Sequence, residues 1–131
     1  MALFFTNAVN TSRATALVTA AGSGSTIKIY SGAAPVNADT AATGTLLVTL
    51  TIAGVLGTVS AGVITLGTVT SGTAAATGTA GYAVLATSAA VTVAFLTSIA
   101  TSGADLNLNS TAISSGGTVS VTSGTITEAY P

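Results

Sequence analysis

The sequence predicts an all-β fold, an antiparallel β-sandwich with jelly-roll topology left open, preceded by one short N-terminal helix. Short segments in which apolar residues alternate with Thr or Ser recur along the chain, and glycine-containing turns separate them. Alternation with period two places one set of side chains in a core and the other set on the opposite face. Many short strands with such turns are typical of sandwiches and barrels.

A length of 131 residues is enough for one domain with a single hydrophobic core. We divide it into an N-terminal arm and short helix, residues 1–25, and a β-sandwich domain, residues 26–131. The helix is expected over residues 7–21, where good N-cap residues and an alanine-rich run precede the glycines of residues 22–25. Its expected buried side is Val9, Ala16, Leu17 and Ala20.

The strands follow from the alternation. Ile27 and Ile29 share one face of the first expected strand, and Leu46 to Ile52 repeats the pattern over a longer segment. Outward-facing Thr suits these strands because β-branched side chains fit the pleat. The expected strands are 26–30, 45–52, 57–60, 62–66, 67–70, 80–86, 91–99, a short segment around Leu106 and Leu108, 118–122 and 125–129. Turns are expected at Ser115–Gly117 and at Ser123–Gly124, and mobile loops at 40–44 and 73–79.

Charge is nearly absent from the chain. Only 4% of the residues are charged, against about 25% in ordinary soluble domains. The five formal charges are Arg13, Lys28, Asp39, Asp105 and Glu128, and none lies between Asp39 and Asp105. Such a composition favours a protein whose surface is covered by copies of itself or by partners.

The residues that usually carry chemistry are also missing. The chain has no His, Cys or Trp, so the common general base and the thiol nucleophile are absent. Two basic residues are too few for a phosphate-binding groove or an anchor on an anionic membrane. We therefore expect no enzymatic activity, no cofactor, no direct nucleic-acid partner and no membrane partner.

Two acidic patterns resemble functional sites. Asp39 and Asp105 could form the carboxylate pair of a glycosidase, but loop and Asx-turn roles explain them better. Asp105, Asn107 and Asn109 resemble part of a calcium loop. The interleaved leucines and the missing closing Glu favour the outward face of an edge strand instead. No catalytic or metal site is predicted.

The stretch from Tyr82 to Ala100 is uncharged and mostly apolar, as a membrane span would be. The stretch is near the required length of about 20 residues. Its Thr and Ser content and the alternation of residues 91–95 favour strands. The N-terminus lacks the positive region of a secretory signal, which suits a protein assembled inside the cell that makes it.

Aromatic and apolar residues at the termini and on strands are candidate subunit contacts. Apolar termini are costly unless they dock, either into their own core or into a neighbouring subunit. Tyrosine is favoured at interfaces, although Tyr on a strand can equally be half-buried within its own domain. The candidates are Leu3, Phe4, Phe5, Tyr30, Tyr82 and Tyr130.

Four segments in order suggest a family. They are Ile27–Pro35, reading I-K-I-Y-S-G-A-A-P, Asp39–Leu47, reading D-T-A-A-T-G-T-L-L, Thr77–Tyr82, reading T-G-T-A-G-Y, and Gly103–Thr127. This order resembles small structural proteins encoded by tailed bacteriophages, which also open with a short helix. The resemblance covers most of the chain, but residues 53–76 lack the polar and aromatic residues expected there.

The resemblance implies a non-enzymatic virion protein and no catalytic residue. The expected function is that of a capsid decoration, or cement, protein. It would bind itself and the major capsid protein, and reside in the virion after assembly in the host cytoplasm. Alternatives remain open: a neck, tail or fibre component, a host-surface or carbohydrate-binding module, and a self-assembling filament or surface-layer subunit.

Overall fold

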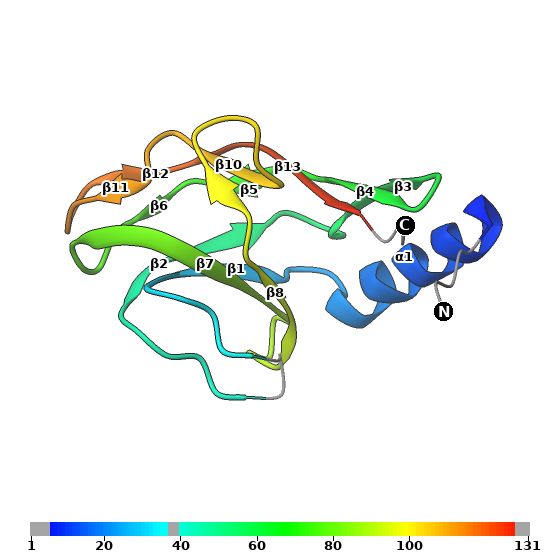
Figure 1. The fold of residues 1–131 in the computed structure, drawn as a ribbon, viewed down its shortest axis with the longest axis horizontal. Coiled ribbons are helices and arrows are strands. Elements are labelled where there is room, and N and C mark those ends of the chain that lie inside the picture. Colours follow the sequence, from blue (N-terminus) through cyan, green and yellow to red (C-terminus); the bar gives the residue numbers. More distant parts are fainter. Residues whose placement is uncertain (1–5, 37–39, 128–131) are drawn as a thin grey trace.

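The chain folds into antiparallel sheets packed together, with a single short helix at one end (Figure 1). The computed structural model describes residues 6–36 and 40–127. Strands make up 46% of the structure. The predicted all-β sandwich with one N-terminal helix is thereby confirmed.

The helix α1 spans Asn7–Ala21. The longer strands are β1 (Thr26–Ser31), β2 (Leu46–Ile52), β3 (Gly57–Ser60), β4 (Val63–Leu66), β7 (Gly78–Ala86), β8 (Thr92–Leu96), β10 (Leu106–Leu108) and β13 (Val121–Thr127). The two-residue strands are β5 (Val69–Thr70), β6 (Gly72–Thr73), β9 (Ile99–Ala100), β11 (Ala112–Ile113) and β12 (Thr118–Val119).

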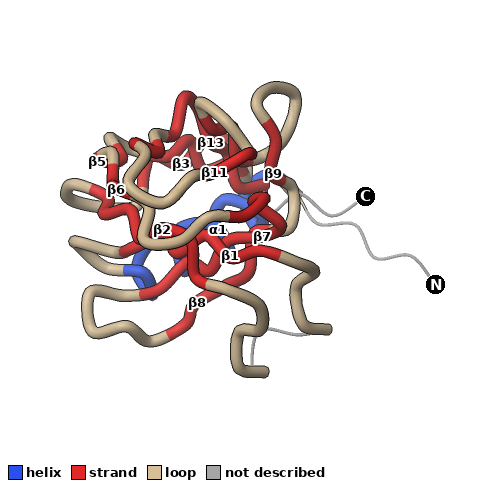
Figure 2. The backbone as a smooth tube through the Cα atoms, turned by 90° about the vertical axis from the view of Figure 1, so that its left-hand side faces the viewer, coloured by secondary structure: helices blue, strands red, loops and turns tan. Residues whose placement is uncertain are grey.

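These strands form two main sheets and one small pair. The first sheet has the order β11-β7-β1-β2-β5, and β8 also pairs with β7. The second has the order β3-β4-β13-β10-β9, while β12 pairs with β6. Neighbours are antiparallel except β9 and β10, which are parallel. Figure 2 shows the layers from the side, with β1, β2 and β7 in one and β3 and β13 in the other.

The core lies between the sheets and follows the predicted alternation. Ile29 of β1 pairs with Val48 on one side and Ala83 on the other, and all three side chains are buried. They belong to one apolar cluster with Ile64 and Leu106 of the second sheet. Full burial of a large aliphatic side chain stabilises a fold by about 1.5–3 kcal/mol. The cluster therefore holds the two sheets together.

The helix has the predicted bounds but buries a different face. Thr6 caps it, since the Val9 N–H donates to Thr6 Oγ1 at 3.3 Å. The fully buried helix residues are Ala14 and Ala21, which lie within the core, whereas Val9 is 42% exposed. Of the four residues expected on the buried side, Leu17 packs on the core, while Val9, Ala16 and Ala20 are exposed, so that prediction was wrong for three of them. Small alanines let the helix approach the strands closely, and hydropathy alone does not reveal this preference.

Two expected elements are organised differently. The expected strand 91–99 is divided between the sheets: β8 pairs with β7 in the first, and β9 pairs with β10 in the second. The expected turn at Ser123–Gly124 was wrong, because both residues lie inside β13. A Cβ added at Gly124 would lie 2.4 Å from Leu66 Cδ1 and 3.4 Å from Leu106 Cδ1. This glycine therefore makes room for two leucines rather than reversing the chain.

The segment 73–79, expected as a mobile loop, is held against the rest of the domain. Ala74 is 4% exposed. Its N–H donates to the Gly117 carbonyl at 2.8 Å, and its carbonyl accepts from the Gly116 N–H at 2.8 Å. The low-complexity segment is thus hydrogen-bonded to the turn at Ser115–Gly117. The turn itself was predicted from the sequence.

Candidate functional site

An aromatic cluster lies on the face of the first sheet that points away from the core. Tyr30 of β1 and Tyr82 of β7 are directly paired across the strands, next to the core-facing Ile29 and Ala83. Their rings stack with centroids 5.4 Å apart and an interplanar angle of 14°. Phe95 of β8 meets Tyr82 edge-on at 5.7 Å and 61°.

Residues 40–45, in the second half of the connection between β1 and β2, are attached to this cluster through Thr43. In Figure 1 they lie on the side of the first sheet opposite the second sheet. The Tyr82 hydroxyl donates to the Thr43 carbonyl at 2.6 Å and accepts from the Thr43 N–H at 2.9 Å. Two further bonds, Ser31 N–H to the Thr45 carbonyl and Thr45 N–H to Ser31 Oγ, close the base of the loop at 3.0 and 3.1 Å.

This geometry separates the two strand tyrosines. Tyr82 is 0% exposed, so it has no surface to offer a subunit, and its position does not support the contact role proposed for it. Tyr30 is half-buried. Leu3, Phe4, Phe5 and Tyr130, the other candidate contacts, lie outside the described residues. The two tyrosines are paired and lie on the same face of the sheet, so strand alternation does not distinguish them. The loop residue Thr43, which binds the Tyr82 hydroxyl, does.

The oxygen-bearing residues around β10 brace the sheet. The Asn107 side chain accepts from the Ala104 N–H at 3.0 Å and donates to the Ala104 carbonyl and to Ser123 Oγ, both at 2.9 Å. The Asn109 side chain accepts from the Ser120 N–H at 3.2 Å and donates to the Thr118 carbonyl at 3.1 Å. β10 lies between β13 and β9, so the expectation of an edge strand was wrong. Both amide oxygens are already used within the chain.

The described charges do not form a cluster. Arg13 lies on α1, Lys28 on β1, and Asp105 just before β10. Asp39 and Glu128 lie outside the described residues. Within residues 6–36 and 40–127, no group of three His, Cys, Asp or Glu residues could hold a metal ion. The described residues therefore bring no acid–base pair together.

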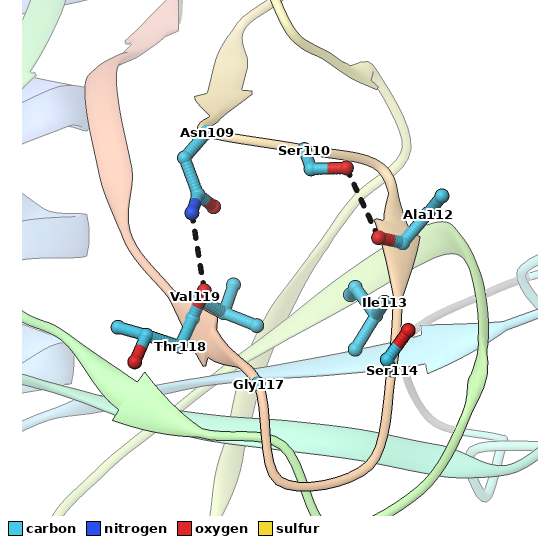
Figure 3. A pocket seen from close by; sticks show the side chains of 8 residues that line it. All are labelled: Asn109, Ser110, Ala112, Ile113, Ser114, Gly117, Thr118 and Val119. Carbon is cyan, nitrogen blue, oxygen red and sulfur yellow. Dashed lines mark hydrogen bonds between the residues drawn. The ribbon is translucent and has the colours of Figure 1, made fainter.

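One pocket of about 190 Å³ opens near β11 and β12 (Figure 3). Its lining is uncharged: Asn109, Ser110, Ala112, Ile113, Ser114, Gly117, Thr118 and Val119. Asn109 is occupied as described above, and Ser110 Oγ donates to the Ala112 carbonyl at 3.0 Å. The pocket could accept a small uncharged polar group, but its lining contains no His, Cys, Lys or carboxylate side chain.

Exposed apolar side chains lie on three loops. Val36 is 97% exposed, Val55 is 59% exposed and Val91 is 61% exposed. The turns that carry Val55 and Val91 meet the turn after α1 at one end of the first sheet. There the Gly24 N–H donates to the Gly54 carbonyl at 3.0 Å, and a Cβ at Gly24 would lie 3.8 Å from Ser88 Cβ. Residues 22–25, 53–56 and 87–91 carry no charge.

Comparison with protein-family models, with curated proteins and with solved structures finds no match. Across the described ranges, no helix has both the length and the apolar character needed to cross a membrane. The uncharged stretch from Tyr82 to Ala100 forms the end of β7 together with β8 and β9. The strand interpretation of that stretch is confirmed.

Proposed function

We propose that this protein is a non-enzymatic structural component of a phage virion, most specifically a capsid decoration protein. It would stabilise the shell by binding other copies of itself and the major capsid protein through uncharged contacts. Two arguments support the proposal. The first is the resemblance of four ordered segments to tailed-phage structural proteins, and the second is the character of the described surface.

The observation that carries the proposal is a surface with very little charge and with apolar loop tips. Arg13, Lys28 and Asp105 are the charged residues in the described part of the chain. The exposed faces of the strands are mostly Thr, and Val36, Val55 and Val91 project from loops. The centres of protein interfaces are depleted in charge, because burying an unpaired charge is costly. A surface of this kind suits burial in an assembly.

Symmetry makes weak contacts sufficient. Burial of apolar surface contributes about 25 cal/mol per Å². A loop tip such as Val55 contributes little alone, but a symmetric shell repeats each contact many times. Modest adhesion from each copy would then add up over the particle.

The alternatives differ from the decoration role in copy number or in the kind of site that they need. A neck, tail or fibre position requires the same kind of surface and differs in copy number. A carbohydrate-binding module would use the pocket at β11 and β12, whose lining has no aromatic platform and whose Asn109 amide is committed to the chain itself. The decoration role therefore remains the leading proposal.

Binding to shells at different salt concentrations tests the proposal. Purified protein is mixed with capsids of the encoding phage from which it has been removed, at about 0.05 M and about 1 M NaCl. Surface charge interactions are screened within about 3 Å at 1 M salt. If the interface is uncharged, binding should be saturable, and the affinities at the two salt concentrations should agree within about threefold. Absence of binding, or a loss of affinity above about tenfold at high salt, would contradict an uncharged adhesive contact.

A further inference from the structure

The strand β8 leaves one long edge of the first sheet unpaired. It pairs with β7 through Ala83 to Ala86, and no strand pairs with its other side among the described residues. Its 5 residues make it longer than any other described strand that pairs on one side only. In an antiparallel strand, alternate residues turn their N–H and C=O groups outward. This edge therefore presents donors and acceptors for another strand.

The edge has one of the protections that natural edges carry, a bulge, but it lacks charge and proline. Proteins commonly place Lys, Pro or a bulge on such strands to prevent pairing with another chain. Residues 91–97, Val-Thr-Val-Ala-Phe-Leu-Thr, contain no charge, proline or glycine. A bulge at Val93 is present, because Leu85 pairs with Ala94 while Ala86 pairs with Thr92. The bulge leaves Ala94–Leu96 in regular register.

The next longest edge strand is shorter than β8. β3 spans four residues and begins with Gly57. The helix α1, which lies beside β3 and β4 at one end of the molecule (Figure 1), contacts both β3 and β8. The remaining edge strands have two residues each. β8 is thus the place where the fold can most readily extend its sheet.

We infer that the edge of β8 pairs antiparallel with β8 of a second copy of this chain, forming a sheet that is continuous across a two-fold axis. This inference rests on the proposal that the chain is an assembly subunit and names its contact. An antiparallel pair of identical strands is self-complementary, since each donates and accepts at equivalent positions. A charged side chain on the partner strand would lie beside the half-buried Phe95 and Leu96. Because burying a charge is costly, the edge favours an uncharged partner strand.

Electrostatics also permits a second copy. The charged residue of the first sheet is Lys28 of β1, which lies two strands away from β8. Lys28 pairs with Val84 of β7, and Val84 pairs with Phe95 of β8. Strands are about 4.8 Å apart, so five spacings separate the two Lys28 strands by about 24 Å across the joined sheet. That distance is more than twice the Debye length of about 8 Å at physiological salt. The Lys28 residues of the two copies therefore do not repel each other appreciably.

Lysines beside the edge test the inference. The variant Thr92→Lys/Thr97→Lys places one charge on the first residue of β8 and one on the residue after its last, at threonines that are exposed. Its matched control, Thr51→Lys/Thr65→Lys, adds the same charge at exposed threonines on β2 and β4, which are paired on both sides. Sedimentation equilibrium of the purified full chain, without capsids, gives the dimer Kd. We expect the edge variant to raise this Kd by about tenfold or more, and the control to leave it nearly unchanged.

Hydrogen exchange on the unmodified chain provides a second test that needs no variant. Amides of residues 92–96 should exchange more slowly as protein concentration rises through the dimer Kd. A chain that stays monomeric at about 1 mM, or an edge variant that dimerises like the control, overturns the inference. Shell binding separates the two proposals: if shells bind but β8 does not pair, only this inference fails, and if β8 pairs but shells do not bind, the capsid decoration role fails.

Discussion

Replacement of Gly81 by alanine is expected to lower the free energy of unfolding by about 3 kcal/mol. An added Cβ would lie 1.8 Å from the Gly32 carbonyl oxygen, 2.7 Å from its carbon and 2.8 Å from its nitrogen. All three atoms belong to the backbone, so no side-chain rotation can relieve the overlap. Gly81 is also the extra residue of a bulge, because Tyr30 pairs with Tyr82 while Ser31 pairs with Ala80.

Urea denaturation of Gly81→Ala and a control variant measures this effect. Gly67 also lacks a positive φ, and a Cβ there would lie 3.3 Å from its nearest neighbour, the Val55 carbonyl oxygen. We expect Gly67→Ala to change the unfolding free energy by less than about 1 kcal/mol. A loss below about 1 kcal/mol for Gly81→Ala would show that the β1–β2 loop can move away from β7 freely.

Replacement of Tyr82 by phenylalanine is expected to cost about 2 kcal/mol. The hydroxyl both donates to and accepts from the Thr43 backbone, at 2.6 and 2.9 Å. Without it, the ring stays buried against Tyr30 and Phe95, but the loop loses its attachment to the sheet. The Thr43 N–H and carbonyl then need water as a partner, so the loop should also open more often.

Tyr30→Phe is the matched control, because Tyr30 stacks in the same cluster and is half-buried. No hydrogen bond of its hydroxyl is seen within the described residues. Thermal or urea unfolding should show a change within about 0.5 kcal/mol for this variant. Amide exchange of residues 40–45 should accelerate in Tyr82→Phe alone. Equal losses of stability in the two variants would contradict the anchoring role of the Tyr82 hydroxyl.

Local pattern was sufficient for the class of fold and for many elements. Residues 7–21 form the helix as predicted, and the alternation in β1 and β2 correctly places Ile29 and Val48 in the core. Both features depend on neighbouring residues: a helix on propensity and caps, a strand on period two. The predicted class therefore needed no knowledge of how the sheets are arranged.

Features set by distant contacts could not be predicted in this way. The buried face of the helix depends on the strands that α1 contacts. Ala14 is therefore buried, while the more hydrophobic Val9 is exposed. Gly124 follows a serine, as in many turns, but it lies in a strand, where the missing side chain leaves space for Leu66 and Leu106. The division of residues 91–99 at Thr97 and Ser98 depends on which sheet each half joins. In each case the partner lies far away in the sequence.

The candidate site shows the same limit. Tyr30 and Tyr82 occupy equivalent alternating positions, yet only Tyr82 is completely buried, because the loop around Thr43 closes over it. Asn107 and Asn109 resembled ligands in sequence but are used for bonds to Ala104, Ser123, Thr118 and Ser120. The scarcity of charge, in contrast, is visible in the sequence alone, and it is the feature on which the proposed function depends most.

The number of copies in a purified virion tests the proposed function most directly. Quantitative mass spectrometry against the major capsid protein gives this ratio. A decoration protein follows the capsid lattice, so we predict on the order of hundreds of copies per particle. About a dozen copies or fewer would place the protein at the neck or tail, and its absence from the particle would contradict a virion role altogether.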